Sequence, residues 1–343
     1  MSELSICILR LSAIGDVTHV VPVIRAIQRH LPRAKITWII GKLEARLLSG
    51  LTGIEFIVFD KKGGFSEVRQ LRQRLKGRRF DVLLQMQVAA RANLLSRLVK
   101  APRRIGWDKP RWRDRHGWFI NQSVESIPFQ HQVDGFLEFA RALDVPAGPP
   151  VWDLPVSGED IAWAQQVLGD GPPILMISPC SSHSLRNWHA ERYAEVADYA
   201  ISKLDMRVVL TGGPSELERQ TGQDIESAMT NQVQNLIGKD TITQSMALLK
   251  QAKIVMSPDS GPAHVASALG IPVIGLYAAT PSQRSGPYNS LDLCVDKYAE
   301  AAQKFRHKRP EELRWGQRIE YPGVMDLIET GEVMDKLKGF MSS

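Results

Sequence analysis

Short runs of β-branched and aliphatic residues alternate with longer amphipathic stretches along most of this chain of 343 residues. Residues 5–11 predict a strand, and residues 20–31 predict a helix because their apolar side chains recur at helical spacing on one face. Further strands are predicted at 35–40, 55–59, 81–85 and 103–105, and helices at 65–75, 89–100 and 133–143. This alternation is typical of an α/β fold built on a doubly wound parallel sheet.

A proline-rich run at residues 145–155 interrupts the alternation and is typical of a linker. Beyond it, strands are predicted at 174–178, 207–211, 254–257 and 273–277, and helices at 190–203, 215–229, 243–251 and 262–269. We therefore predict two Rossmann-like domains, residues 1–150 and 151–321, and a helical tail at 322–343 whose docking stays open. Ligands of such domains bind beyond the carboxyl ends of the strands, so chemistry is expected in a cleft that the two domains face.

The composition is that of a globular protein, with 43% hydrophobic and 23% charged residues. Cys7, Cys180 and Cys294 are too widely spaced for a zinc site, and we expect reduced, buried thiols. No apolar run reaches the roughly 18 residues of a membrane-spanning helix. The chain enters its first strand without the pattern of a signal peptide, so we expect a cytoplasmic protein.

Positive charge is concentrated in residues 61–120, which contain 17 Lys and Arg against 4 Asp and Glu. Because the whole chain has a net charge of only +6, the remainder is net acidic. Such a basic segment indicates a polyanionic partner, which is a nucleic acid, an anionic membrane surface or a phosphorylated glycolipid. A solvated basic face without any partner explains the same charges, and composition alone leaves both interpretations open.

Two common nucleotide-binding motifs are absent. The sequence has neither G-x-x-x-x-G-K-[ST] nor a G-x-G-x-x-G after its first strand, which argues against P-loop hydrolysis and against ordinary NAD binding. The loop after the first strand instead contains Gly15, which permits a tight turn, and Asp16. This Asp16 is either a cap of the following helix or a carboxylate placed to remove a proton from an attacking hydroxyl group.

Two loops in the second half follow predicted strands and have anion-binding composition. Ser181, Ser182 and Arg186 offer two hydroxyls and a guanidinium to an oxyanion or phosphate. A plain polar loop has the same composition, so the alternative stays open. In the second loop, Glu216 follows a pair of glycines and is placed to contact a ribose or the edge of a base.

A third loop, at residues 257–264, joins an apolar strand to an apolar helix. Pro262 suits the first helical position, where its missing N–H costs nothing. Gly261 allows close approach of a ligand to the backbone, and the N-terminal end of the helix favours an anion. The pattern predicts a phosphate-binding helix start, although a helix that is merely well capped has the same residues.

Together these loops resemble the family of ADP-heptose:lipopolysaccharide heptosyltransferases, glycosyltransferase family 9. The residues that carry the resemblance are Ser12, Gly15, Asp16, His19, Ser181, Ser182, Arg186, Trp188, Asp259, Ser260, Gly261 and His264. Their order and spacing match over nearly the whole chain. The resemblance implies a GT-B fold, with the acceptor bound by the N-terminal domain and the ADP-sugar by the C-terminal domain.

The resemblance also implies a role for each matched residue. Asp16 is the implied general base, and Arg10 is a neighbouring cation at the sugar or acceptor site. The implied donor contacts are Ser181, Ser182, Arg186, Ser260, Gly261 and His264 to the diphosphate, Glu216 to the adenosine and Asp259 to the heptose hydroxyls. Family members often have Lys at the position of Arg186 and Thr at those of Ser181 and Ser182, and Ala13 replaces a frequent serine.

The implied reaction is a single inverting displacement on ADP-heptose. Asp16 deprotonates an acceptor hydroxyl as that hydroxyl attacks the anomeric carbon. Arg186, the two serine hydroxyls and the helix start stabilise the departing ADP, with no cofactor and no required metal. On overall resemblance, transfer of the first heptose to Kdo is favoured over transfer of a later one.

The resemblance also implies a partner for the basic segment at residues 61–120. The implied acceptor is Kdo–lipid A or another inner-core lipopolysaccharide at the cytoplasmic face of the inner membrane, an anionic surface, and no nucleic acid is expected. Acceptor contacts are predicted from His19, Arg104, Arg111, Arg113 and Arg115. Trp107, Trp112 and Trp118 interleave with these cations, and we expect them to pack in the core instead of anchoring in lipid.

Two rival functions stay open. Another GT-B enzyme acting on a nucleotide sugar, such as an epimerase or a transferase of a different sugar, shares the phosphate site but needs no base toward an external acceptor. A non-enzymatic polyanion binder explains the basic segment but not the three matched loops.

Overall fold

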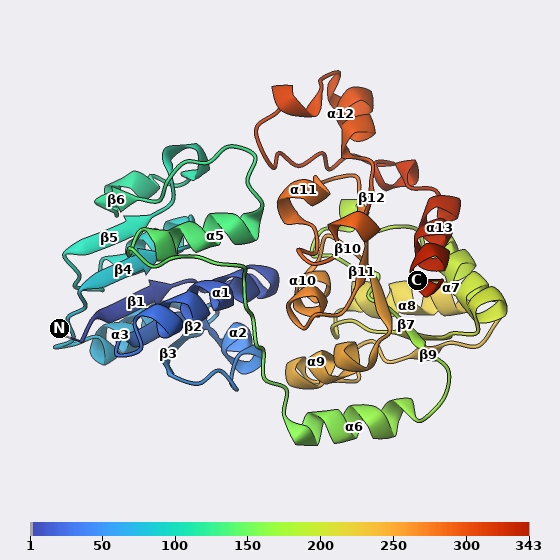
Figure 1. Cartoon of the computed structure of the whole chain (residues 1–343), viewed down its shortest axis with the longest axis horizontal. Helices are drawn as coiled ribbons and strands as arrows, with labels where there is room; N and C mark the ends of the chain where they lie inside the picture. Colours follow the sequence, from blue (N-terminus) through green and yellow to red (C-terminus); the bar gives the residue numbers. More distant parts are fainter. Residues whose placement is uncertain (1–2, 343) are drawn as a thin grey trace. The chain divides into compact units, whose positions relative to one another are not determined.

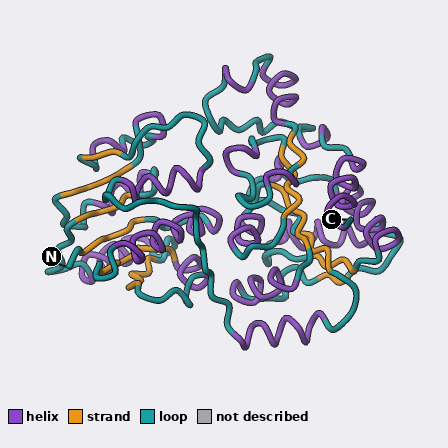
Figure 2. Tube along the Cα trace, viewed as in Figure 1, coloured by secondary structure: helices purple, strands orange, loops and turns teal. Residues whose placement is uncertain are grey.

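The computed structural model describes residues 3–342, and contacts within the chain divide it into two compact units, Met1–Pro155 and Val156–Ser343. The division falls at the end of the proline-rich run. Each unit contains one parallel sheet flanked by helices (Figure 1, Figure 2). The predicted α/β fold with two Rossmann-like domains is therefore confirmed.

Six parallel strands form the sheet of the first unit, in the order β3-β2-β1-β4-β5-β6. In the centre, Cys7 of β1 lies opposite Thr37 of β2 and Leu83 of β4. The central strands are buried on both faces, which explains why they are apolar runs without alternation. The strands are β1 (Ser5–Leu9), β2 (Lys35–Gly41), β3 (Ile54–Phe59), β4 (Val82–Gln85), β5 (Arg103–Gly106) and β6 (Gln122–Ser123).

Five α-helices and two short 3-10 helices are described in the first unit. Helices α1 and α5 pack against each other (Figure 1). Apolar side chains of α3 and α4, such as Leu71 and Leu95, join Cys7 and Leu9 in one buried cluster. The helices are α1 (Ile14–His30), α2 (Lys42–Leu47), α3 (Gly64–Arg74), α4 (Ala90–Ser96), η1 (Lys109–Arg111), η2 (His116–Trp118) and α5 (Gln132–Arg141).

The second unit repeats the topology of the first. Its sheet order is β9-β8-β7-β10-β11-β12, so its first strand again pairs with its fourth. Both sheets thus have the strand order of dinucleotide-binding domains, in which the chain reverses direction across the sheet between these two strands. The strands are β7 (Ile174–Ile177), β8 (Arg207–Leu210), β9 (Gln234–Asn235), β10 (Ile254–Pro258), β11 (Val273–Tyr277) and β12 (Val295–Asp296).

The C-terminal tail belongs to the second unit. Its helix α13 packs on α7 and contacts β11 and β12, and Val333 and Leu337 are fully buried in the core there. The helices of this unit are α6 (Gly158–Leu168), η3 (Ser184–Arg186), α7 (Ala190–Leu204), α8 (Glu216–Ala228), α9 (Ile242–Gln251), α10 (Gly261–Ala268), α11 (Ser282–Ser285), η4 (Leu291–Leu293), α12 (Tyr298–Arg306), η5 (Pro310–Glu312), η6 (Met325–Leu327) and α13 (Thr330–Met341).

The start of α1 was predicted wrongly. The helix begins at Ile14, not at residue 20, and continues through Pro22. An internal proline removes one helical hydrogen bond and usually marks a helix start or a kink. Here the residues on both sides of Pro22 are buried, and their packing against the sheet and α5 offsets the lost bond. The consequence for the site is that Gly15 and Asp16 are helical residues and do not form a turn before the helix.

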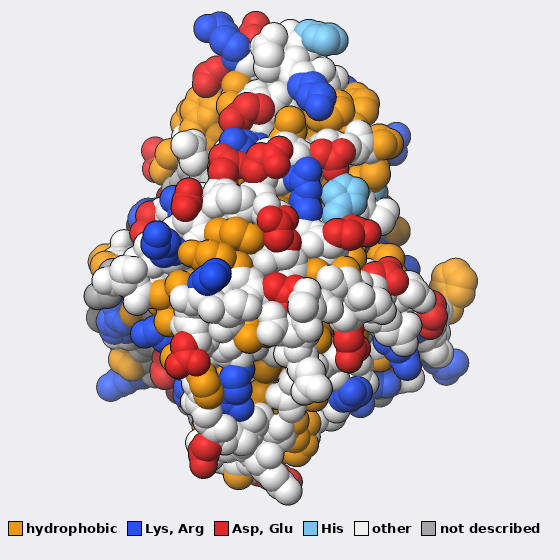
Figure 3. All heavy atoms as spheres, turned by 90° about the vertical axis from the view of Figure 1, so that its right-hand side faces the viewer, with side chains coloured by type: hydrophobic (Ala, Val, Ile, Leu, Met, Phe, Trp, Pro, Cys, Tyr) orange, Lys and Arg blue, Asp and Glu red, His pale blue; other side chains and the backbone are white. Residues whose placement is uncertain are grey.

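The cysteines, the hydrophobic helices and the charged side chains considered in the sequence analysis can be located in the structure. Cys7, Cys180 and Cys294 are buried and unpaired, as predicted. Within residues 3–342, no helix combines the length and the low polarity that crossing a bilayer demands. On the face of the second unit that Figure 3 shows, acidic and basic side chains are intermixed. The basic segment at residues 61–120 belongs to the first unit.

A buried polar chain fastens the loop after β5 to the sheet. The Trp107 backbone N–H donates to Nε2 of His116 (3.2 Å), so the proton of this imidazole is on Nδ1, which lies 2.9 Å from Oδ1 of Asn93. The same amide oxygen accepts from Nε2 of Gln85 (2.6 Å). All three side chains are fully buried, and burial lowers the pKa of His116 to about 4. The imidazole is neutral in the native protein at neutral pH.

His116 is expected to make the first unit sensitive to acid. Because its native pKa of about 4 lies below the ordinary value of 6.5, the unfolded chain binds the proton first as the pH falls. Stability is then lost between pH 6.5 and pH 4, by at most about 1.4 kcal/mol per pH unit, and is unaffected by this group above that window. An NMR titration checks this, with the His116→Gln spectrum identifying the resonance. A ring that titrates near 6.5 in the folded protein contradicts it.

Candidate functional site

The polar residues predicted to carry chemistry follow the carboxyl ends of central strands in both units. In the first unit, Arg10 directly follows β1, and Asp16 lies in the first turn of α1. Met86 and Gln87 follow the neighbouring strand β4. This is the point at which the strand order reverses, where doubly wound domains bind ligands.

Asp16 is the third residue of α1, whose N-cap is Ala13. Its Oδ2 accepts a hydrogen bond from the Ala13 backbone N–H (3.2 Å) and forms an ion pair with the Arg10 guanidinium. Its Oδ1 accepts a hydrogen bond from the side-chain amide of Gln132. The side chain is still 25% exposed. The carboxylate is therefore fixed through both oxygens and remains accessible to a substrate hydroxyl.

Arg10 is buried and held independently of Asp16. Its Nη1 donates to the carbonyl of Met86 (2.6 Å), and its guanidinium lies 5.5 Å from the centre of the Phe136 ring. Its Nε is buried and has no hydrogen-bond partner. An unused buried donor on a charged group is costly, and such groups are common where a ligand supplies the missing acceptor. The position fits the predicted role of a cation beside the reacting groups.

Two glutamines complete this group, and the sequence did not single out either. Gln132 is the first residue of α5, which packs on α1 and so delivers its amide to Asp16. Gln87 accepts a hydrogen bond from the Leu11 N–H (2.7 Å) and donates to the hydroxyl of Ser12 (3.4 Å), which fixes the loop between β1 and α1. A glutamine at a helix start or after a strand is too common a pattern to identify either residue without the fold.

In the second unit, Arg186 is the centre of another charged group. It is 8% exposed and lies between two carboxylates, with Nη1 3.5 Å from Oδ2 of Asp259 and Nε 3.3 Å from Oε1 of Glu320. Its Nη2 donates to the hydroxyl of Ser182 (3.1 Å). Nε of Arg186 and Oε1 of Glu320 are both buried without a hydrogen bond. The arginine therefore has an unused donor, as expected of a site that binds an anion.

Asp259 follows β10 and is held on both oxygens. Oδ2 accepts a hydrogen bond from the hydroxyl of Thr280 (2.9 Å), and Oδ1 lies 3.5 Å from Nε2 of His264. Burial raises the pKa of Asp259, but the hydrogen bonds from His264 and Thr280 and the charge of Arg186 together outweigh it and hold this pKa below its usual value. The site thus holds a stable buried carboxylate that can accept hydrogen bonds from sugar hydroxyls. Glu320 and Thr280 were not predicted.

Two of the hydroxyls predicted to bind phosphate close their own loops. The Ser181 hydroxyl donates to the carbonyl of His183 (2.9 Å) and accepts from its N–H (3.2 Å). Ser260 caps α10 by accepting from the Ala263 N–H (3.4 Å). Gly261 is the first residue of that helix, so Pro262, predicted to be first, is second. Both hydroxyls have the local role that was the alternative interpretation, and their contact with a phosphate stays a prediction.

Glu216 is exposed at the first position of α8. The carboxylate that closes the preceding glycine turn is that of Glu218, which accepts hydrogen bonds from the Gly213 N–H (2.7 Å) and the Ser215 hydroxyl (2.6 Å). Glu216 is therefore not needed for the local structure and lies at the carboxyl end of β8. Its contact with adenosine stays a prediction.

Two of the residues predicted to contact the acceptor are engaged inside the first unit. His19 is buried, and its ring lies 5.8 Å from that of Phe136. Arg104 donates to the backbone carbonyls of Phe119 (2.8 Å), Val99 (2.9 Å) and Ser96 (2.8 Å). Burial, together with a smaller effect of the Arg97 charge, lowers the pKa of Arg104. These contacts give both side chains a structural role, and acceptor contact by either remains a prediction.

The other three predicted acceptor residues lie in the loop after β5. Arg111 is partly buried over the ring of Trp107, with 4.9 Å between the guanidinium carbon and the ring centre. Arg113 and Arg115 are exposed, and Arg115 stacks on Trp118 at 4.8 Å. Trp107 is buried, as expected for core packing. The same expectation was wrong for Trp118, which is 68% exposed because the loop turns it outward.

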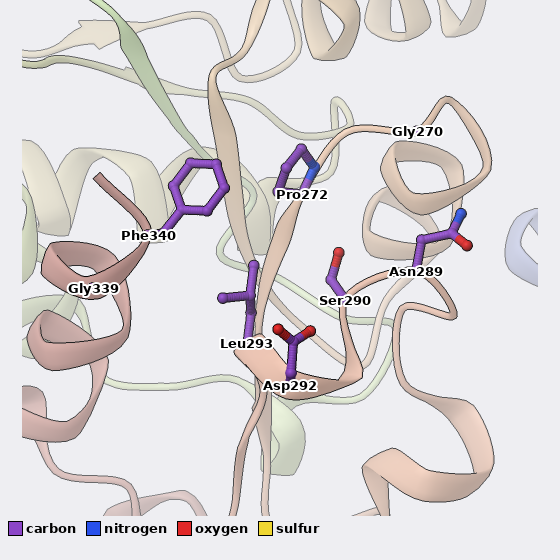
Figure 4. Close-up of a pocket in the computed structure, with 8 residues that line it drawn as sticks. All are labelled: Gly270, Pro272, Asn289, Ser290, Asp292, Leu293, Gly339 and Phe340. Atoms are coloured by element: carbon purple, nitrogen blue, oxygen red, sulfur yellow. The ribbon is translucent and has the colours of Figure 1, made fainter. Parts of the chain in front are cut away.

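A cavity of about 430 Å³ lies elsewhere in the second unit (Figure 4). It is at the amino ends of β11 and β12, whereas the charged groups lie at carboxyl ends. No predicted site residue lines it. The lining residues are Gly270, Pro272, Asn289, Ser290, Asp292, Leu293, Gly339 and Phe340.

Comparison with known proteins identifies the family. The family model for glycosyltransferase family 9 (heptosyltransferase) matches residues 68–314. The lipopolysaccharide core heptosyltransferase OpsX of Haemophilus influenzae is 40% identical over 97% of this chain and 96% of its own length. The chain belongs to glycosyltransferase family 9, the heptosyltransferases. It is thus a glycosyltransferase, and the resemblance inferred from the three loops is confirmed.

Solved structures of this family share the fold of the heptosyltransferase. A family 9 glycosyltransferase from Veillonella parvula superposes with a TM-score of 0.80 at 21% identity, covering 99% of this chain and 97% of that one. The ADP-heptose lipopolysaccharide heptosyltransferase II of E. coli gives a TM-score of 0.75 at 21% identity, covering 99% of both chains. At these identities the likeness establishes the fold, and the GT-B architecture predicted from the resemblance is confirmed.

If Asp16 is the base as predicted, Asp16→Asn is expected to lower kcat by about 10²–10⁴, because an amide cannot take the proton of the attacking hydroxyl. The amide oxygen can still accept the Ala13 N–H bond, so the start of α1 is retained. Steady-state transfer kinetics with calorimetric ADP binding measure the two effects separately, and ADP affinity is expected to be unchanged. Near-normal turnover removes Asp16 from the role of base.

If Arg186 contacts the diphosphate as predicted, Arg186→Ala is expected to weaken ADP binding by about 10–100-fold, because a charge-assisted hydrogen bond is lost. Arg186→Lys retains the charge, and its loss is expected to be smaller. Glu320→Gln is the matched control: it removes a carboxylate that competes for the guanidinium, and ADP binding is expected to be at least as tight. Titration calorimetry measures all three. Equal ADP affinity in Arg186→Ala and wild type excludes the contact.

Proposed function

We propose that this heptosyltransferase transfers heptose from ADP-heptose to the inner core of lipopolysaccharide, with Kdo of Kdo–lipid A as the acceptor. The main support is the pair of charged groups at equivalent places in the two units, a carboxylate held by Arg10 and a guanidinium held by Asp259 and Glu320. Further support comes from the Haemophilus relative, a lipopolysaccharide core heptosyltransferase, and from structures of an E. coli heptosyltransferase with ADP and with ADP-2-deoxy-2-fluoro heptose.

In this proposal the first unit activates the acceptor. The Asp16 carboxylate takes the proton of the attacking Kdo hydroxyl, whose oxygen bonds to the anomeric carbon of heptose while the bond from that carbon to the ADP oxygen breaks. Arg10 and Gln132 keep the carboxylate oriented, because each contacts one of its oxygens. One displacement inverts the configuration at the anomeric carbon.

The second unit binds the donor. Arg186 exchanges its contact with Glu320, in which Nε makes no hydrogen bond, for a contact with the diphosphate. There it stabilises the charge that develops on ADP as it leaves. Asp259 accepts hydrogen bonds from heptose hydroxyls, and Glu216 contacts the adenosine. Because a guanidinium, hydroxyls and a helix start already offset the charge of the leaving group, no metal is required in this proposal. The enzyme acts in the cytoplasm, peripherally at the inner-membrane face.

The function is tested by incubating the enzyme with ADP-heptose and a set of truncated core acceptors in the presence of EDTA. A mass increase of one heptose on a Kdo acceptor, with an inverted anomeric centre by NMR, is the expected result. Asp16→Asn is the matched control for background transfer. Transfer only to acceptors that already contain heptose assigns a later step of the core. Conversion or hydrolysis of ADP-heptose that is independent of acceptor contradicts the proposal.

A further inference from the structure

The most exposed large apolar side chains lie together in the basic segment. Among residues 3–342, Phe65 is 94% exposed, Trp118 68% and Leu94 66%. All three come from residues 61–120 of the first unit, where Lys and Arg far outnumber Asp and Glu. Single exposed apolar residues are common on protein surfaces, whereas several close together indicate an interaction site.

Printed contacts join these side chains into one surface. On α4, Arg91, Leu94 and Arg97 recur at a spacing of three residues and so share a face of the helix. At one end, Arg91 donates to the carbonyl of Lys61 (2.9 Å), which places it beside the start of α3, where Phe65 is the second residue. At the other end, Arg97 lies 3.4 Å from the carbonyl of Trp118.

The charge of this surface is positive. Lys62, Arg91, Arg97 and Arg115 are exposed around the apolar side chains. The two neighbouring acids are engaged locally: Asp114 accepts from the Ala90 N–H (2.8 Å), and Asp60 accepts from the Lys62 N–H (2.9 Å) and pairs with Lys42 (3.4 Å). Within residues 3–342, none of these four exposed cations forms a salt bridge with a carboxylate.

The surface is next to the carboxyl edge of the sheet in the first unit, where the acceptor is proposed to bind. Phe65 follows the carboxyl end of β3, α4 begins after β4, and Arg115 and Trp118 lie in the loop after β5. Asp16 follows β1 in the same sheet, and all these strands are parallel. The apolar and basic side chains thus begin at the edge of the sheet where the proposed base lies.

We propose that Phe65, Leu94 and Trp118, with Lys62, Arg91, Arg97 and Arg115, form a surface that docks on an anionic lipid bilayer. The apolar side chains enter the headgroup region, the tryptophan lies at the interface, and the long cationic side chains reach lipid phosphates. The apolar residues of this surface are separated by arginines. That pattern suits the hydrated headgroup region of a bilayer better than it suits a protein–protein interface, whose core is continuously apolar. The benefit for transfer, holding a lipid-linked acceptor beside Asp16, rests on the proposed function.

Vesicle co-sedimentation tests the surface independently of catalysis. Wild type is expected to bind vesicles of phosphatidylethanolamine and phosphatidylglycerol, to be released by salt, and to bind pure phosphatidylcholine weakly. Phe65→Ser with Leu94→Ser is expected to weaken binding about tenfold, with Leu217→Ser, an exposed leucine of α8, as the apolar control. Lys62→Gln with Arg97→Gln is expected to weaken vesicle binding by about tenfold or more, because two cations that attract the anionic surface are lost.

Arg29→Gln with Arg33→Gln is the matched charge control, since both arginines are exposed in the first unit outside the surface. Transfer to a deacylated, water-soluble acceptor reports the proposed function alone, and Phe65→Ser with Leu94→Ser is expected to leave it unchanged. Loss of binding in the surface variants but not in the controls supports the proposal, even if transfer fails. The proposal is contradicted if wild type does not bind the anionic vesicles, or if surface and control variants lose binding equally. It is also contradicted if the enzyme binds only vesicles that contain a protein partner.

Discussion

Parallel pairing of the first strand with the fourth is the constraint on which both sites depend. β1 hydrogen-bonds to β4 in the first unit and β7 to β10 in the second, so the segments after these strands leave the sheet at one edge. Residues that are distant in the sequence meet there, such as Leu11 with Gln87 and Ser178 with Ser257. Because the strands are buried on both faces, polar groups can act only at the strand ends, and in both units the predicted site residues lie at the carboxyl ends.

The two units use this edge for opposite electrostatic purposes. In the first, a carboxylate is the exposed group and a buried arginine orients it. In the second, a buried arginine is the central group, and two carboxylates lie beside it; Nε of both arginines is without a hydrogen bond. In each unit, the side chain that orients the central group also has a hydrogen bond to an uncharged partner. Arg10 donates to the Met86 carbonyl, and Asp259 accepts from the Thr280 hydroxyl. A proton acceptor and an anion binder can therefore be built on the same topology.

The sequence predicted the sheets well because buried parallel strands are apolar runs that are easily recognised. The predicted strand at 273–277 coincides with β11, and that at 35–40 differs from β2 by one residue. It missed β6, β9 and β12, which have only two residues each, and also the helices α2, α6 and α12. Asp16, Arg186 and Asp259 could be found because each lies in the segment that comes after a central strand. Gln132 and Glu320 could not, since their contacts depend on how remote segments pack.

The start of α1 shows a different limit. Propensity rules treat Pro22 as a boundary, and only the burial of the surrounding helix overrides them. The exposure of Trp118 was likewise outside the reach of composition, because a loop anchored by His116 decides which way that side chain turns.

The position of Glu320 beside Arg186 has a consequence for selectivity among anions. One guanidinium that faces two carboxylates gives this group a net negative charge, so it exerts little attraction on inorganic phosphate or other small anions. A ligand must bring additional binding energy, from a base, a ribose or a sugar, before displacing the glutamate becomes favourable. If Arg186 binds the diphosphate as proposed, abundant simple anions are therefore weak competitors for it.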